Sequence, residues 1–569
     1  MRASAFARAL ALVPAMVPMV LHASAVPLGR LGHASCTGCG GMGSRRAWSK
    51  RDKVLRRTGG ADAGAVPPET RAACKQCAGD GVVRSEVVRE PALAALRPLG
   101  LGDADDARPL VAIVGGGIAG AAVALGLQQR GLRALVFEAD GAFDERAQGY
   151  ALTLQQGNSA LRRFGVSLAE QGIVHRAHIS MDASGAQLGR FGDGRSVASE
   201  GGDAAASARV QRGRSNLLVP RQMLRASLLA ELAPGTVRWG HRLLAAERTA
   251  SGVRLAFSTR KWPRPAEPRA ADGLAEAAGD ADAGEGGPAT VSVEAALVIG
   301  ADGIWSSLRQ KLLPTPLAQP AASLLDAPLR YLGLIVILGR ARCEHSLGEE
   351  RHIWEVVDGS ARLYAMPYDE SLTMWQLSFP LDLEQARTLG RAGGGALRDA
   401  ALAATSGWCA PVPQLLGATA AGDITGYPAF DRPLPDPDEL RTALGPAAVL
   451  VGDAVHPMSP FKGQGANQAL IDGLELARAL SAVPSLGPPP PGLREPALSL
   501  DDALGAFERA MLERARVKVE ASARAAKFLH SAPALATGNC TRVSAARGKG
   551  GPTACGRGTG GGTAGADAP

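Results

Sequence analysis

The chain of 569 residues is 46% hydrophobic, 20% charged and 4% aromatic, a composition that supports at least one large core and excludes disorder throughout. The net charge of +8 belongs to the N-terminal region, because residues 1–100 hold 15 basic and 6 acidic residues and the remainder is close to neutral. We therefore expect no nucleic-acid partner, and, since no stretch approaches the roughly 20 apolar residues that span a bilayer, no integral membrane segment.

The first residues have the features of a targeting leader. An apolar run from Ala9 to Leu21 precedes the small residues Ala23-Ser24-Ala25, and no acidic residue occurs before Asp52. Basic, acid-poor segments of this kind direct proteins to organelles. We expect residues 1–35 to form a two-part leader, with a plastid favoured; a secretory or cytoplasmic location is the alternative.

Two copies of the pattern CxxCxGxG follow the leader. Cys36 and Cys39 belong to the first copy, and Cys74 and Cys77 belong to the second. The pattern resembles the zinc-binding repeat of the DnaJ-type chaperones, and four thiolates suit one tetrahedral Zn²⁺ ion. We expect a zinc module over residues 36–85, with a redox pair of dithiols as the alternative reading.

A strand, a glycine-rich turn and a helix open the folded body. Hydrophobic patterning predicts a strand over 110–114, a helix over 118–130 capped by Gly131, and a second strand over 133–138. The turn has the pattern GxGxxG, which lets a pyrophosphate approach the backbone at a helix N-terminus, and Glu138 is placed to accept hydrogen bonds from a ribose. This unit predicts a dinucleotide site formed by Gly115, Gly117, Gly120 and Glu138.

The next elements are mainly strands. We expect strands over 252–258 and 291–299, separated by a disordered insertion over 262–289 that is rich in Pro, Ala, Gly and acidic residues. Four further strands are expected over 330–340, 351–358, 361–367 and 372–380, and a long helix is expected to begin near Ala466. Residues 536–569 are Gly-rich and are expected to be disordered.

Two later motifs each place an aspartate after an apolar strand. Asp302 and Gly303 follow the first strand; Gly452 and Asp453 follow the second, ahead of a Pro/Gly loop. Either aspartate alone could be an ordinary turn or helix cap.

Together with the GxGxxG turn, and in this order, these motifs resemble the FAD-dependent aromatic-ring hydroxylases, typified by p-hydroxybenzoate hydroxylase, over roughly residues 108–530. The resemblance implies an α/β fold: a Rossmann-like FAD/NAD(P)-binding domain of the glutathione-reductase type, an interleaved β-sheet substrate domain and C-terminal helices. The corresponding ranges are 108–312 and 428–535 for the FAD-binding domain and 313–427 for the substrate domain.

The resemblance also implies cofactor-binding roles. It assigns Asp302 and Gly303 to FAD and the nicotinamide cofactor, and Asp453 to the ribityl chain of FAD. The cofactor residues expected in this way are Gly115, Gly117, Gly120, Glu138, Arg146, Arg221, Asp302, Gly303, Gly452, Asp453, Pro460, Gly463, Gly465 and Asn467. No catalytic residue is assigned, because the family's oxygen transfer is carried by the flavin and His456 is expected to be structural.

The expected enzyme is an FAD-dependent, NAD(P)H-driven monooxygenase that inserts one oxygen atom of O₂ into a small organic substrate, aromatic or isoprenoid. A flavin dehydrogenase or oxidase without oxygen transfer is one alternative. A zinc-module interaction protein that uses the flavin fold as a scaffold is another.

Overall fold

The structure is a computed structural model that describes residues 108–145, 150–168, 172–173, 177–191, 216–259, 289–313, 328–487 and 497–537. It also gives the backbone of four short strands nearer the N-terminus, over 32–35, 44–47, 70–73 and 82–85. Residues 1–31 of the expected leader, the insertion up to residue 288 and the tail beyond residue 537 lie outside the described residues.

A five-stranded parallel sheet forms the centre of the chain's first large layer. Its strands, in spatial order, are β11 (Val237–Arg238), β6 (Ala134–Phe137), β5 (Val111–Val114), β15 (Leu297–Gly300) and β21 (Ala448–Leu450). The predicted strand–helix–strand unit is confirmed: α3 (Ile118–Gln128) joins β5 to β6, and Gly131 after it adopts a φ of +75°. Every residue of β5, β6 and β15 is buried, as expected for parallel strands covered on both faces.

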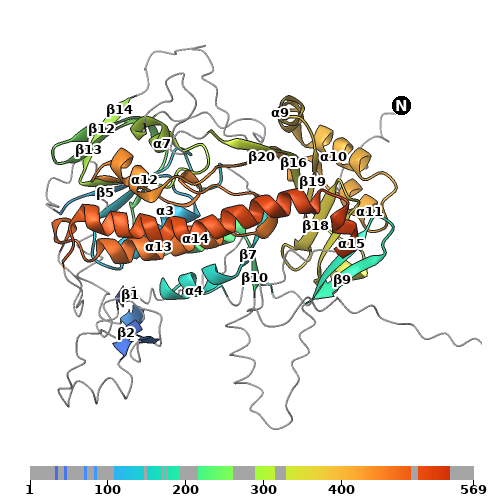
Figure 1. Cartoon of the computed structure of the whole chain (residues 1–569), viewed down its shortest axis with the longest axis horizontal. Helices are drawn as coiled ribbons and strands as arrows, with labels where there is room; N and C mark the ends of the chain where they lie inside the picture. The colour runs from blue at the N-terminus through green and yellow to red at the C-terminus, as the bar shows by residue number, and fades with distance from the viewer. Residues whose placement is uncertain are drawn as a thin grey trace, which may run out of the picture.

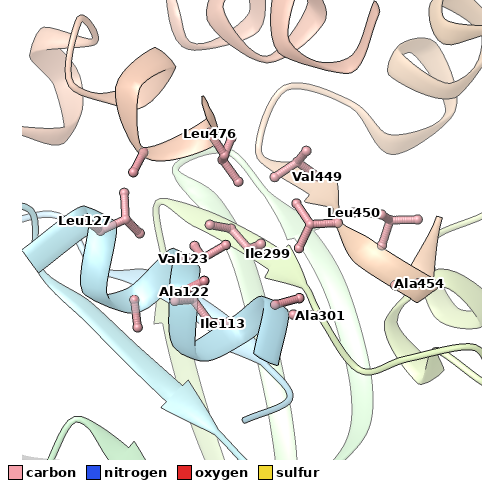
Figure 2. Packing of buried hydrophobic residues seen from close by; sticks show 14 of the residues in the cluster. Ile113, Ala122, Val123, Leu127, Ile299, Ala301, Val449, Leu450, Ala454 and Leu476 are labelled. Carbon is pink, nitrogen blue, oxygen red and sulfur yellow. The ribbon is translucent and has the colours of Figure 1, made fainter. Parts of the chain in front are cut away.

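Two helices pack tightly against each other beside this sheet. In α3, a Cβ added to Gly126 would lie 2.7 Å from the Cβ of Ala477 in α13 (Gly465–Leu480), and one added to Gly473 of α13 would lie 2.8 Å from that of Ala122. Glycine at both positions therefore lets the helices approach. Figure 2 shows the apolar layer that results, with Val123 and Leu476 in the same cluster as Ile299 and Leu450 of the sheet.

The strand expected over 291–299 is two strands. β14 (Thr290–Ala295) pairs with β13 (Gly252–Ser258), which pairs with β12 (Arg242–Thr249) in an antiparallel sheet. β15 starts at Leu297 and enters the parallel sheet, and between them the N–H of Ala296 donates to the carbonyl of Leu110. The chain changes sheets at Ala296, and a continuous apolar run carries no signal of such a change.

A seven-stranded sheet forms the second large layer. Its order is β20 (Thr425–Asp431), β16 (Arg330–Ala341), β19 (Thr373–Pro380), β18 (Arg362–Pro367), β17 (Ile353–Val357), β8 (His178–Asp182) and β9 (Gln187–Phe191). The four strands expected after residue 330 are confirmed. The sheet also takes β8 and β9 from within 108–312, the range expected to be FAD-binding domain, because β8 pairs in parallel with β17.

The two layers are connected by helices and by a small antiparallel ribbon. α9 (Leu383–Arg391), α10 (Gly393–Ala404) and α11 (Val412–Gly417) lie together at the seven-stranded sheet, and the long helix α14 (Leu500–Leu529) runs beside α13 and on towards that sheet (Figure 1). The other elements are β7 (Ala151–Leu154), α4 (Gln156–Arg163), β10 (Leu217–Pro220), α6 (Arg221–Ala230), α7 (Ser307–Leu312), α8 (Ser346–Glu349), α12 (Pro437–Leu444) and α15 (Pro533–Thr537). The α/β fold class is confirmed. Within the described ranges, none of the helices has the length and apolarity needed to cross a bilayer.

Candidate functional site

The three glycines of the first motif have different surroundings. Gly115 has a φ of +101°, and a Cβ there would lie 2.6 Å from the carbonyl oxygen of Ala301; at Gly120 it would lie 1.9 Å from the carbonyl oxygen of Gly115. At Gly117 a Cβ would meet nothing within 4 Å. The first and third glycines are therefore needed for packing, whereas the second opens onto free space at the N-terminus of α3, where N–H groups attract a phosphate.

Glu138 lies against this turn. One carboxylate oxygen accepts a hydrogen bond from the N–H of Gly116 at 2.6 Å, and the other accepts from the N–H of Asp140 at 2.9 Å. The buried side chain of Arg225 completes the arrangement, since its Nε donates to the Gly116 carbonyl at 2.8 Å and its guanidinium lies 3.8 Å from Glu138. The sequence analysis missed Arg225, although it follows Arg221 by four residues and so lies on the same face of α6.

Asp302 supports the start of a helix. Its carboxylate accepts from the hydroxyl of Ser306, the N-cap residue of α7, at 2.5 Å and from the N–H of Leu308 at 3.0 Å. Burial raises its pKa, and these hydrogen bonds oppose the rise. The structure thus gives Asp302 a structural role beside the helix cap, and a contact with a cofactor stays a prediction. Gly303, beside it, has a φ of +80° and open space around it.

Asp453 differs from Asp302 in its hydrogen bonds and in its exposure to solvent. Its carboxylate makes no hydrogen bond with any described residue, and the residue is exposed. One side of the residue is open to solvent, yet the protein around the carboxyl group raises its pKa by burial. The charges of His456 and Arg221 lower that pKa. A Cβ on Gly465 would lie 3.7 Å from its Oδ1, so the free carboxylate lies at the N-terminus of α13.

A buried ionic network supports the turn that carries Asp453. Asp472 of α13 is fully buried, and its Oδ2 accepts from the N–H of Gly452 at 2.9 Å and from Nε2 of His456 at 2.7 Å. Its Oδ1 accepts from Arg514 of α14 at 3.0 Å. Burial disfavours the charge on His456, but Asp472 outweighs that effect and raises the pKa of the imidazole. His456 therefore braces the turn, and Asp472, which the sequence analysis missed, connects the turn to two helices.

Hydrogen bonds to neighbouring segments of the chain fix the shape of the Pro/Gly loop. Pro460 begins a short 3₁₀ turn, and Gly463 after it has a φ of +60° with open space around it. The amide oxygen of Asn467 accepts from the N–H groups of Gln155 and Gly157, and its NH₂ donates to the carbonyls of Thr153 and Gly463. These four bonds use the whole hydrogen-bonding capacity of the side-chain amide, so this amide fixes the loop. A cofactor contact of Asn467 stays a prediction.

The two expected arginines have different outcomes. Arg221 begins α6, and its guanidinium lies 5.4 Å from the ring centre of Tyr150 and lowers the pKa of Asp453. Arg146 lies outside the described residues. The structure thus brings Arg221 and Asp453 into one neighbourhood, although they are far apart in sequence.

Comparisons with known proteins agree with this geometry. Residues 446–486 match the FAD binding domain family. The chain is 31% identical to 3-amino-4-hydroxybenzoate 2-monooxygenase PtnB3 of Streptomyces platensis over 396 residues, which are 66% of this chain and 80% of that protein. The chain belongs to the FAD-dependent aromatic hydroxylases.

Two further likenesses fit this family of monooxygenases. The chain is 29% identical to the phenazine 1,6-dicarboxylic acid hydroxylase PhzS of Lysobacter antibioticus, over 65% of this chain and 82% of that protein. The fold is similar to that of Klebsiella pneumoniae HpxO, solved with FAD and uric acid, with a TM-score of 0.55 at 20% identity, covering 75% of this chain and 90% of that one.

The described residues suit the FAD of this monooxygenase family. A Cβ at Gly117, Gly303 or Gly463 would meet nothing within 4 Å, and the carboxylate of Asp453 accepts no hydrogen bond from the described residues. Open glycines and an available carboxylate are what a long, hydroxyl-bearing dinucleotide requires. The residues present therefore fit FAD.

The described residues do not include the expected zinc ligands. In the ranges described, no group of three or more His, Cys, Asp and Glu side chains is placed to hold a metal ion. Cys36, Cys39, Cys74 and Cys77 lie outside those ranges.

Proposed function

We propose that this FAD-dependent monooxygenase takes its electrons from NADH or NADPH and hydroxylates a small aromatic compound. The observation that carries the proposal is the carboxylate of Asp453, which accepts no hydrogen bond from the described residues and lies near Gly465 and the charge of Arg221. When bound, FAD supplies the redox chemistry: two electrons from the nicotinamide and one oxygen atom of O₂ to the substrate, with water as the other product.

The chain's own residues prepare the site for that chemistry. When FAD is bound, Asp453 would hold its ribityl chain, and the open space at Gly117 would admit its diphosphate to the N-terminus of α3. The N-terminus of α13, opened by Gly463 and Gly465, presents a positive dipole end that stabilises negative charge on a reduced ring system. Asp472, His456 and the side-chain amide of Asn467 hold these groups in position.

The aromatic substrate class is supported by the relatives. PtnB3 is named for 3-amino-4-hydroxybenzoate and PhzS for a phenazine dicarboxylic acid, and both are aromatic acids. The seven-stranded sheet supports the same class, because its face towards Tyr150 carries Tyr364, Met366 and Met374, an apolar and polarisable group suited to a flat ring.

Isotope labelling tests the proposal. The purified protein is mixed with NADH or NADPH, ¹⁸O₂ and a panel of aromatic acids that includes 3-amino-4-hydroxybenzoate. We expect one labelled oxygen atom in the organic product and one in water. Consumption of O₂ that yields hydrogen peroxide alone with every compound would favour the oxidase alternative, and reduction without O₂ uptake would favour a dehydrogenase.

We also propose that the N-terminal cysteines bind one Zn²⁺ ion. The described strands support this, because β1 (Gly32–Ser35) pairs with β4 (Val82–Ser85), and β2 (Ser44–Ala47) pairs with β3 (Thr70–Ala73). The first CxxCxGxG motif joins β1 to β2 and the second joins β3 to β4. Since Ser35 pairs with Val82 and Ser44 with Ala73, both motifs start and finish at the same ends of paired strands.

Elemental analysis of the full-length protein tests the zinc proposal. We expect one zinc per chain, lost in a Cys36→Ser/Cys74→Ser variant that keeps its FAD. Two results would instead favour a thiol pair. One is that the variant keeps its zinc; the other is that the unaltered protein, prepared in the presence of zinc, contains none.

A further inference from the structure

Two tyrosines lie where the turn that carries Asp453 meets the seven-stranded sheet. Tyr150 precedes β7, and its carbonyl accepts a hydrogen bond from the N–H of Arg221 at 3.0 Å. Tyr427 belongs to β20 and is paired with Val336 of β16. Both rings pack against the same apolar cluster, which includes Val336 and Phe461 of the Pro/Gly loop. The two phenols therefore share one location, although 276 residues separate them in the chain.

The hydroxyl groups of these two tyrosines make no hydrogen bond with any residue that the structure describes. Other tyrosines of the chain differ: Tyr331 donates to the carbonyl of Leu381 at 2.7 Å, and Tyr368 accepts from Arg340 at 3.2 Å. Both residues are half-buried, so a ligand that enters this location can reach the two hydroxyl groups and complete their hydrogen bonds.

The electrostatic surroundings place both phenols beside the cofactor motifs. Burial raises the pKa of Tyr150 and of Tyr427, and for each the charge of Arg221 opposes the rise while that of Asp453 adds to it. The two phenols also influence each other. They thus remain protonated at neutral pH and can donate hydrogen bonds.

The other side of Tyr150 is apolar. Its ring packs in the cluster that contains Tyr364, Met366 and Met374, and the N–H of the following residue, Ala151, donates to the sulfur of Met374 at 3.2 Å. The location therefore combines a flat, polarisable wall with two unused hydroxyl donors. A ring that bears an oxygen acceptor matches both features.

We propose that Tyr150 and Tyr427 bind the substrate and select an aromatic ring that carries a hydroxyl or carbonyl oxygen. This inference rests on the aromatic hydroxylase function proposed above. The two phenols donate to that oxygen and hold the ring against the sheet, on the side where Asp453 and Arg221 receive the cofactor. A site that hydrogen-bonds a substrate oxygen discriminates strongly against the analogue that lacks it, because its polar groups are then left unpaired.

Binding measurements on the FAD-loaded protein test the proposal without turnover. Matched pairs of ligands are titrated while the flavin absorbance is followed: phenol and benzene, 1-naphthol and naphthalene, and 3-amino-4-hydroxybenzoate and 3-aminobenzoate. The variants are Tyr150→Phe, Tyr427→Phe and the double variant, which remove only hydroxyl groups. Tyr331→Phe is the control, because its hydroxyl already has a protein partner away from this location.

We expect a hydroxylated ligand to bind more tightly than its counterpart, and each Phe substitution to weaken that binding by about 2- to 10-fold, with FAD affinity unchanged. Tyr331→Phe should leave the preference intact. The proposal is overturned if no hydroxylated ligand binds better than its counterpart or if the double variant keeps the preference. It is also overturned if the variants lose FAD, which would assign the phenols to the cofactor. Because no NAD(P)H is used, a failure of hydroxylation in the labelling experiment is distinguishable from each of these results.

Discussion

The imidazole of His456 donates a hydrogen bond of 2.7 Å to the carboxylate of Asp472, and both side chains are fully buried beneath the turn that carries Asp453. The same carboxylate accepts from the N–H of Gly452 and from Arg514. A buried carboxylate on α13 that accepts from two residues of the turn and from one residue of α14 fixes these three segments relative to one another. The aspartate that we assign to FAD, Asp453, therefore depends on a second, buried aspartate nineteen residues further along the chain.

Replacing Asp472 should harm both stability and FAD binding. Asp472→Asn leaves the buried His456 without its counter-charge and Arg514 with Glu475 alone, and removing one partner of a buried ion pair costs about 3 kcal/mol or more. Glu475→Gln is the matched control, since Glu475 also accepts from Arg514, at 2.8 Å, but is 40% exposed. Urea unfolding of the FAD-free proteins and FAD titration measure the two effects. Equal stability of the two variants would show that the network does not support the turn.

Asp453 and Asp302 should separate cofactor binding from stability. Asp453→Ala removes a carboxylate with no described hydrogen bond, so the FAD-free protein should keep its unfolding free energy while FAD affinity falls about 10- to 150-fold, the value of a charge-assisted bond. Asp302→Ala removes the acceptor that holds Ser306, the N-cap residue of α7, and the N–H of Leu308, and should cost about 0.5–2 kcal/mol of stability. Isothermal titration with FAD and urea unfolding distinguish the two outcomes, and a reversed pattern would exchange the roles of the aspartates.

The glycine turn offers a similar contrast. Gly117→Ala should fold normally, because its backbone has a φ of −71° and a Cβ meets nothing within 4 Å, yet FAD should bind about tenfold more weakly as the methyl group displaces the diphosphate. Gly120→Ala should destabilise the fold by about 3 kcal/mol or more, because its Cβ would lie 1.9 Å from a carbonyl oxygen. Circular dichroism melts and FAD titration check both. A Gly117→Ala variant with unaltered FAD affinity would mean that the open space is not the phosphate site.

His530 should make stability depend on acid pH. Its Nδ1–H donates to the Ala526 carbonyl, its Nε2 accepts from the hydroxyl of Ser378 at 2.8 Å, and burial lowers its pKa to about 4. The unfolded chain binds this proton near pH 6.5 whereas the folded protein does not until about pH 4, so the stability is full above pH 6.5 and is lost as the pH falls between these values. The loss is at most about 3 kcal/mol.

The difference between the wild type and His530→Gln isolates this effect. Burial raises the pKa of Glu508 to about 7, which acts in the opposite sense in the same pH range, but equally in both proteins. The unfolding free energies of the wild type and of His530→Gln, measured at pH 4.5, 5.5, 6.5 and 7.5, should therefore converge as the pH falls. Parallel profiles would indicate that His530 is hydrated and titrates normally.

Most of the fold could be predicted from local sequence patterns. Apolar runs located β5, β6, β13 and the four strands of the substrate sheet, because a buried strand needs such a run whatever surrounds it. The GxGxxG turn and the two aspartate motifs indicated a flavin-binding α/β enzyme, because phosphate and ribityl groups demand glycine and carboxylate at set places along the chain. The break at Ala296 and the pairing of β8 with β17 were not predictable, since each depends on which strand lies next to which.

The role of each residue within the site was decided by tertiary structure alone. The sequence by itself determined that two aspartates follow apolar strands, but only folding engages Asp302 at the start of α7 and leaves Asp453 without a hydrogen bond from any described residue. Folding likewise brings Asp472 beneath Gly452, Arg225 against the glycine turn, and Tyr427 beside Tyr150. Hydrogen bonds and burial are properties of neighbours in space, and these neighbours come from segments that carry no local pattern linking them.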